Sequence, residues 1–133
     1  VAFTPTVSET YTVVGTDANG CTGSASINVT VLPVPNAGIN ANPLAGDSPL
    51  FVEFANSSTN ATNYTWEFGN GTPTITTTTN GVQSTTYNTP GDYTVVLTAS
   101  NGLCEDTAMV IISVEGFPPF EILVPNVFTP NGA

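Results

Sequence analysis

The stretch Tyr64–Gly71, which reads YTWEFGNG, constrains the fold more than any other part of the chain. Its three aromatic residues Tyr64, Trp66 and Phe68 alternate with polar ones, so in an extended strand all three rings lie on one face. Gly69-Asn70-Gly71 then supplies the positive-φ positions that a tight reversal needs. Because the rings require a second sheet to cover them, the stretch predicts an all-β protein whose core forms around this strand.

The charge composition excludes several classes of function. The chain has 133 residues with Lys+Arg 0, His 0 and Asp+Glu 10, which gives a formal net charge of −10. Without cationic side chains there is no counterion-release term, so we expect no nucleic-acid partner and no attraction to anionic membranes. Without histidine or lysine the chain has no Ser-His-Asp unit, imidazole metal ligand or Schiff base. Only carboxylate chemistry remains, and we do not expect an enzyme.

The neutral polar residues indicate strands joined by turns. Threonine favours half-buried strand surfaces, and asparagine and glycine favour turns. With 23 Thr and 14 Asn the chain is rich in both kinds, which also suits a protein outside the cell. No signal peptide and no apolar run long enough to cross a membrane is present, so we expect a mature piece or an excised part with no membrane insertion.

An internal repeat divides the chain. Residues 9–31 predict a hairpin with strands at about Thr10–Thr16 and Ser24–Leu32, and residues 91–114 repeat it. The matching pairs, with Leu103 as one extra residue, are Tyr11–Val14 with Tyr93–Val96, Asn19-Gly20 with Asn101-Gly102, Cys21 with Cys104 and Val31 with Val114. We therefore interpret residues 1–34 as the C-terminal hairpin of a preceding repeat. A lone hairpin is marginal in water, so it should lean on a missing portion, a neighbouring domain or another chain.

Residues 35–116 contain the elements of a complete domain. One strand is predicted from the alternation of Leu50, Val52 and Phe54, and another from Tyr93, Val95, Leu97 and Ala99. The run Thr72–Thr79 predicts an exposed or edge strand, with low-complexity disorder as the alternative.

Two motifs in this region resemble the PKD family, the immunoglobulin-like modules of extracellular proteins. Tyr64–Gly71 is similar to the family signature Tyr-x-Trp-x-Phe-Gly-Asp-Gly, although Glu67 and Asn70 stand where Asp is usual, and Pro90–Val95 matches Pro-Gly-x-Tyr-x-Val. The resemblance implies an Ig-like β-sandwich over residues 35–116. It also implies a structural core that includes Tyr64, Trp66, Phe68, Tyr93 and Val95, with Tyr93 placed as in the tyrosine corner of sandwich domains.

The end of the chain has a second resemblance. Residues 125–132, PNVFTPNG, are similar to the opening of the gliding-motility-associated C-terminal domain of Bacteroidota surface proteins, the type B signal for type IX secretion; Ala133 stands where Asp is usual. Residues 117–133 are therefore expected to be a linker and a strand that lead into a sorting domain. The candidate strand-donor residues are Ile122, Val124, Val127 and Phe128.

The sequence offers three candidate binding or modification sites: a disulfide, a calcium site and a glycan site. A Cys21–Cys104 disulfide, within one chain or between chains, competes with the favoured alternative of two separate buried thiols. Calcium suits an acidic extracellular chain, but Glu105 and Asp106 are more simply explained as solvated carboxylates, and we assign no metal or other cofactor. Asp106-Thr107-Ala108 fits the O-glycosylation motif of Bacteroidota, which would make Thr107 a glycan site.

These observations favour a structural or adhesive function without catalysis. The hypothesis is a module of an extracellular cell-surface protein, stalk or filament, whose partners are neighbouring domains or further copies joined head-to-tail by strand addition. The alternative is an accessory module of a secreted hydrolase that binds glycan or protein. In that case Tyr64 and Trp66 would form a sugar-stacking platform, although we expect both side chains to pack in the core.

Overall fold

The computed structural model describes residue 2 and residues 4–119, and the chain divides into two compact units, Val1–Val34 and Pro35–Ala133. Every element in the described residues is a β-strand. The first unit contains β1 (Glu9–Thr16) and β2 (Thr22–Val29). The second contains β3 (Ile39–Asn42), β4 (Ala45–Asp47), β5 (Leu50–Asn56), β6 (Asn63–Glu67), β7 (Ile75–Thr77), β8 (Gln83–Tyr87), β9 (Gly91–Ser100) and β10 (Glu105–Glu115). The predicted all-β fold is confirmed.

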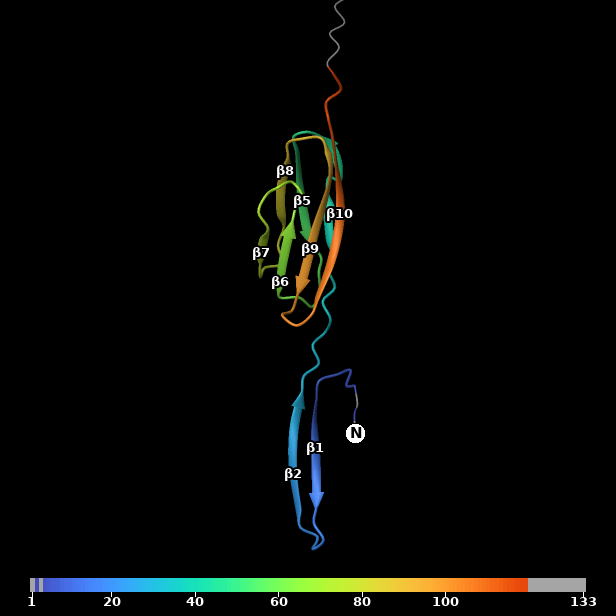
Figure 1. Ribbon diagram of the computed structural model, residues 1–133, viewed down its shortest axis with the longest axis vertical. Coiled ribbons are helices and arrows are strands. Elements are labelled where there is room, and N and C mark those ends of the chain that lie inside the picture. Colours follow the sequence, from blue (N-terminus) through green and yellow to red (C-terminus); the bar gives the residue numbers. More distant parts are fainter. Residues whose placement is uncertain (1, 3, 120–133) are drawn as a thin grey trace, which may run out of the picture. The chain divides into compact units, whose positions relative to one another are not determined.

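The first unit is a regular antiparallel hairpin, drawn in blue in Figure 1. Its pairing runs without a bulge from Glu9↔Val29 to Thr16↔Thr22. The turn is held by Asp17, whose Oδ1 accepts hydrogen bonds from the backbone N–H groups of Asn19 (2.8 Å) and Cys21 (2.9 Å). The second strand ends earlier than the sequence predicted, at Val29, since the backbone N–H of Val31 instead donates to Ser8 Oγ (2.8 Å).

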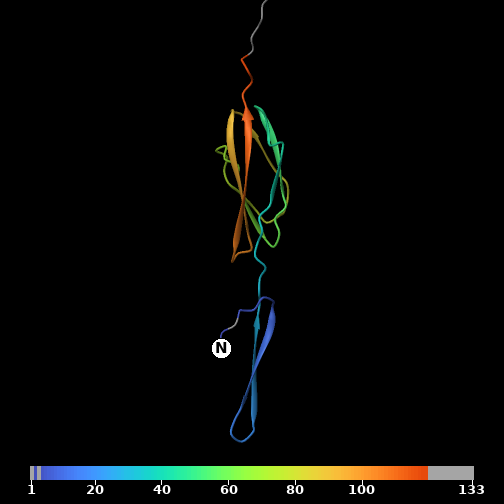
Figure 2. The ribbon, with the colours of Figure 1, turned by 90° about the vertical axis from the view of Figure 1, so that its right-hand side faces the viewer.

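The second unit is a sandwich of two sheets. One has five strands in the order β4-β10-β9-β6-β7, and the other has three in the order β3-β5-β8. All neighbours are antiparallel except β4, which pairs parallel to the end of β10. In Figure 2 the orange strands β9 and β10 lie in one layer and green β5 in the other. A two-layer sandwich follows from strands that each bury one face.

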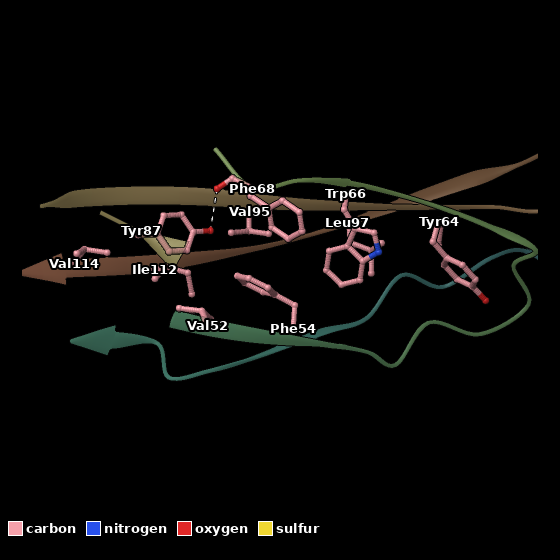
Figure 3. Packing of buried hydrophobic residues seen from close by; sticks show 11 residues of the cluster. Val52, Phe54, Tyr64, Trp66, Phe68, Tyr87, Val95, Leu97, Ile112 and Val114 are labelled. Atoms are coloured by element: carbon pink, nitrogen blue, oxygen red, sulfur yellow. Dashed lines mark hydrogen bonds between the residues drawn. The ribbon is translucent and has the colours of Figure 1, made fainter. Parts of the chain in front are cut away.

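Alternation along the strands places the core between these layers. In β9 the side chains of Val95, Leu97 and Ala99 are buried while their neighbours are more exposed, as the sequence predicted. In β5 the buried positions are Val52 and Phe54. The buried cluster, seen in Figure 3, comprises Val52, Phe54, Tyr64, Trp66, Phe68, Tyr87, Val95, Leu97, Ala99, Ile112 and Val114.

The threonine-rich run forms an edge strand, but a short one. Of Thr72–Thr79 only Ile75–Thr77 pairs, antiparallel to β6 at the border of the five-stranded sheet. The reversal before it uses Gly69 (φ 73°) and Gly71 (φ 80°), as expected from the sequence. Gly69 also lies against β9, because a Cβ there would sit 2.6 Å from the carbonyl oxygen of Thr94. Strands β3, β4 and β8 were not predicted, since they are short and their alternation is weak.

Candidate functional site

Trp66 lies at the centre of the sandwich. Its side chain has no exposed surface, and its ring packs against Phe54 (centroids 6.2 Å apart) and stacks on Phe68 (6.1 Å). Tyr64 is also buried, and its hydroxyl donates to the carbonyl of Ala61 (3.0 Å). Neither ring offers a face to solvent, so the sugar-stacking platform does not form. The indole Nε1 is buried without a hydrogen-bond partner in the described structure.

Tyr87 is a core residue that the sequence did not single out. It is buried, its hydroxyl donates to the carbonyl of Phe68 (2.9 Å), and its ring lies 4.4 Å from that of Tyr93, centroid to centroid. Figure 3 shows the hydroxyl reaching across the core. Burial, with a smaller contribution from Tyr93, raises the pKa of Tyr87 to about 12. The only signal in the sequence was its position just before the Asn88–Gly91 turn.

Tyr93 itself packs at the rim of this core and is only partly buried. Its hydroxyl donates to the backbone carbonyl of Thr89, four residues upstream (2.8 Å). This is the hydrogen bond that a tyrosine corner makes. The bond fixes the turn that leads into β9.

The carboxylates of the described residues do not gather into a metal-binding group. Asp106 Oδ2 accepts a hydrogen bond from the backbone N–H of Ala37 (2.8 Å), which ties β10 to the start of the sandwich, and Asp92 accepts one from Ser113. Glu105, next to Asp106, is exposed. Within residues 4–119 no three His, Cys, Asp or Glu side chains come close enough to hold a metal ion. The acids that are engaged hold the backbone or a neighbouring side chain.

The two cysteines are exposed, which overturns the expectation of buried thiols. Cys21 and Cys104 each occupy the last position of a hairpin loop, and both thiols are free. Both cysteines lie in loops. The alternation of buried and exposed side chains that decides burial within a strand therefore does not apply to them. In the second loop Asn101 Oδ1 accepts from the N–H groups of Leu103 (3.1 Å) and Cys104 (2.9 Å).

The remaining candidate positions differ in what the structure shows. Thr107 is exposed in β10, so its hydroxyl is accessible, and its glycosylation stays a prediction. The candidate strand donors Ile122, Val124, Val127 and Phe128 lie outside the described residues. The described part of the chain contains no pocket and no helix able to cross a membrane.

The hairpin of the first unit exposes large apolar side chains on its strands. Val13, paired with Ala25, is 71% exposed, and Ile27 is 66% exposed. These side chains share one face with the pair Gly15↔Gly23, where the backbone is bare. No further strand of the described structure pairs with β1 or β2. Among the described residues, both outer backbone edges of this hairpin are therefore without a partner strand, and Val13 and Ile27 are exposed.

The equivalent hairpin of the sandwich, β9–β10, is completed on both edges. β6 pairs antiparallel with β9, with Trp66 opposite Leu97, and β4 pairs with β10. The two hairpins keep the same faces but differ in register by two residues. Tyr93 pairs with Ile112, whereas Tyr11 pairs with Ile27 and not with Val29, the counterpart of Ile112 (112 − 83 = 29).

Comparison with solved structures shows the same sandwich in several proteins. Carbohydrate-binding modules of the β-sandwich superfamily, described for promiscuous specificity, match with TM-score 0.58 and 24% identity over 65% of this chain and 36% of theirs. The PKD1 domain of Vibrio anguillarum Epp matches with TM-score 0.50 and 25% identity over 65% of this chain and 99% of that domain. A solution structure from Methanosarcina mazei matches with TM-score 0.51 and 31% identity over 65% of this chain and 57% of that one.

The chain thus spans 36% of the carbohydrate-binding-module chain, and the similarity to it shows the fold alone. No curated protein matches the sequence. The PKD domain model, however, matches residues 36–114, which include both sheets of the sandwich, the Trp66 core and the tyrosine corner. The chain belongs to the PKD domain family.

Proposed function

We propose that this chain is a non-catalytic structural module of an extracellular surface protein of the Bacteroidota type, in an adhesin, stalk or filament. The observation that carries the proposal is the contrast between its two units. The sandwich buries the three rings of its aromatic strand, whereas in the described residues no further strand covers either edge of the hairpin, and Val13 and Ile27 are exposed on one face. A two-stranded hairpin is at best marginally stable in water, so this unit requires a partner.

The partner that we propose is a second copy of the chain, joined by strand addition. Strand addition gives affinity through main-chain hydrogen bonds and specificity through alternate side chains. The contact is heterologous, because the hairpin of one copy meets a different part of the next, so it propagates into a head-to-tail array. The hairpin suits this role because only Glu9 and Asp17 of the ten acids belong to the first unit. Charge repulsion between copies is therefore weakest there.

An enzymatic function has no support in the geometry. The sandwich core is packed around Trp66, and the engaged carboxylates Asp92 and Asp106 hold Ser113 and the backbone of Ala37. The accessory glycan-binding alternative loses its best feature as well, since Tyr64 and Trp66 are buried.

Light scattering of the purified chain from low to high micromolar concentration tests the proposal. We expect the average mass to rise steadily with concentration instead of levelling off at a dimer. A chain that stays monomeric at the highest concentration would refute assembly.

A further inference from the structure

We propose that the free edge of β1 binds, in antiparallel orientation, the segment Phe120–Val124 of a second copy, with the ring of Phe120 seated over the Gly15↔Gly23 pair. This inference rests on the proposed function and names the contact that produces the assembly. It follows from three observations: the unprotected edge, the template that the sandwich provides, and the match of side-chain sizes.

The first observation is that β1 lacks the devices that protect natural edge strands. Such strands usually carry charges, prolines or bulges that discourage pairing with another chain. β1 pairs with β2 in an unbroken register and contains no proline, and its only charged residue is Glu9 at its start. No strand of the described structure other than β2 pairs with β1, so its outer edge can accept a further strand.

The second observation is that the β9–β10 hairpin of the sandwich shows how a further strand pairs with a hairpin of this kind. β9, the repeat counterpart of β1, is paired antiparallel along its other edge by β6 over five residues. β4 pairs with β10 over only three. Antiparallel pairs are also somewhat more stable per residue than parallel ones, so the edge of β1 is the better acceptor.

The template also shows where the largest side chain belongs. β6 places Trp66 opposite Leu97, and the counterpart of Leu97 in β1 is Gly15 (97 − 82 = 15, the offset between Tyr11 and Tyr93). At Gly15 and its partner Gly23 there is no side chain, and a Cβ added to Gly23 would meet nothing within 4 Å. A bare glycine pair on an apolar face is a site where an aromatic ring of an adjacent strand covers the backbone.

The third observation is the size order along the hairpin face. From the turn towards the base, the pairs are Gly15↔Gly23, Val13↔Ala25 and Tyr11↔Ile27, so the side chains grow. In the segment between Pro119 and Pro125 the alternate residues are Phe120, Ile122 and Val124, so they shrink. Antiparallel pairing sets the largest residue of the segment against the smallest pair of the hairpin. The prolines at both ends confine the strand to the five residues between them.

The charges permit this register. With Phe120 beside Gly15, Glu121 falls beside Val14, which keeps it away from the two acids of the first unit, Glu9 and Asp17. Glu121 then lies on the face opposite Phe120, where the side chains around Val14 are polar ones such as Thr12 and Ser24.

The test uses the full chain, at a concentration where it is monomeric, and a dye-labelled synthetic peptide of residues 117–128 followed by fluorescence anisotropy. Gly15→Val fills the seat with a side chain, and we expect it to weaken peptide binding at least about tenfold, as loss of an aromatic anchor does. The hairpin should tolerate the substitution, because a Cβ at Gly15 meets only the carbonyl oxygen of Gly23, at 3.9 Å. Ser24→Val, which adds similar bulk to the opposite face, is the matched control and should leave binding unchanged.

Peptide variants test the register independently. Phe120→Ala should abolish most of the binding, whereas Phe128→Ala should have little effect. The inference is overturned if the wild-type peptide does not bind, if Gly15→Val binds as well as the Ser24→Val control, or if Phe128 and not Phe120 is required.

The two proposals can fail separately. If the chain associates at high concentration but the Gly15→Val variant associates equally well, the proposal of assembly stands and the proposed contact of Phe120 with the Gly15↔Gly23 pair is wrong. If the wild-type chain never associates and also fails to bind the peptide, both proposals fall.

Discussion

Alkaline titration of the Tyr87 hydroxyl offers a direct test of the sandwich core. In the native chain the pKa of Tyr87 is about 12, against an ordinary value of 10.0, because the buried phenolate would lose its hydration. Below pH 10 both the folded and unfolded states hold the proton, and stability is complete. Between pH 10 and 12 the unfolded chain releases the proton while the folded chain keeps it, so stability falls with rising pH. At about 1.4 kcal/mol per unit of pKa difference, the loss by pH 12 is on the order of 2 kcal/mol.

The composition makes this test unusually clean. The chain has no lysine or arginine, so tyrosines are the only side chains with ordinary pKa values near pH 10. Urea unfolding followed by Trp66 fluorescence at several pH values from 8 to 12 measures the free energy of unfolding directly. Tyr87→Phe should cost about 1 kcal/mol at pH 8, from the lost hydrogen bond to Phe68, and should flatten the alkaline decline.

Tyr64→Phe is the control at pH 8 for the loss of a buried hydroxyl, since it removes a different hydrogen bond from the same core. The reasoning is refuted if wild-type stability is constant from pH 10 to 12, or if Tyr87→Phe declines as steeply as the wild type.

Three further predictions concern the stability of the sandwich, each measured by urea unfolding at neutral pH. Trp66→Ala should cost about 3–5 kcal/mol of stability, and Trp66→Phe less than half of that. The phenyl ring keeps much of the packing, and the substitution removes the buried Nε1 that has no partner; equal losses would contradict this. Gly69→Ala should cost more than about 2 kcal/mol, because its Cβ would meet the Thr94 carbonyl at 2.6 Å, whereas Gly71→Ala has open space and should cost about 1 kcal/mol for its positive φ alone. Asp106→Asn should cost about 1 kcal/mol through its weakened bond to Ala37, and Glu105→Gln almost nothing; the reverse order would show that the Asp106 contact is unimportant.

The sandwich could be predicted because its strongest signals are local. Three rings at alternate positions before Gly69-Asn70-Gly71 specify a buried strand and a turn, and Val95, Leu97 and Ala99 specify its neighbour. Short strands such as β4 could not be predicted. Its three residues are held by parallel pairing to Ser113–Glu115, a long-range contact that leaves no periodic pattern in the sequence.

The sites were harder to predict than the fold. Cys21 and Cys104 occupy exposed loops, where no alternation reports burial, and the sequence suggested buried thiols. Tyr87 lies in a strand of polar residues, and its burial depends on Phe68 and Tyr93 from other elements. The Gly15↔Gly23 pair becomes visible only once the register of the hairpin is known.

Hydrogen exchange of the full chain at low and high concentration tests the central claim, that the sandwich is complete and the hairpin needs a partner. We expect the amides of β6, β9 and β10 to be protected at every concentration, and those of β1 to exchange rapidly in the monomer and become protected as the average mass rises. Protection of the β1 amides that is already complete in the dilute monomer, or rapid exchange of β1 at all concentrations, would contradict it.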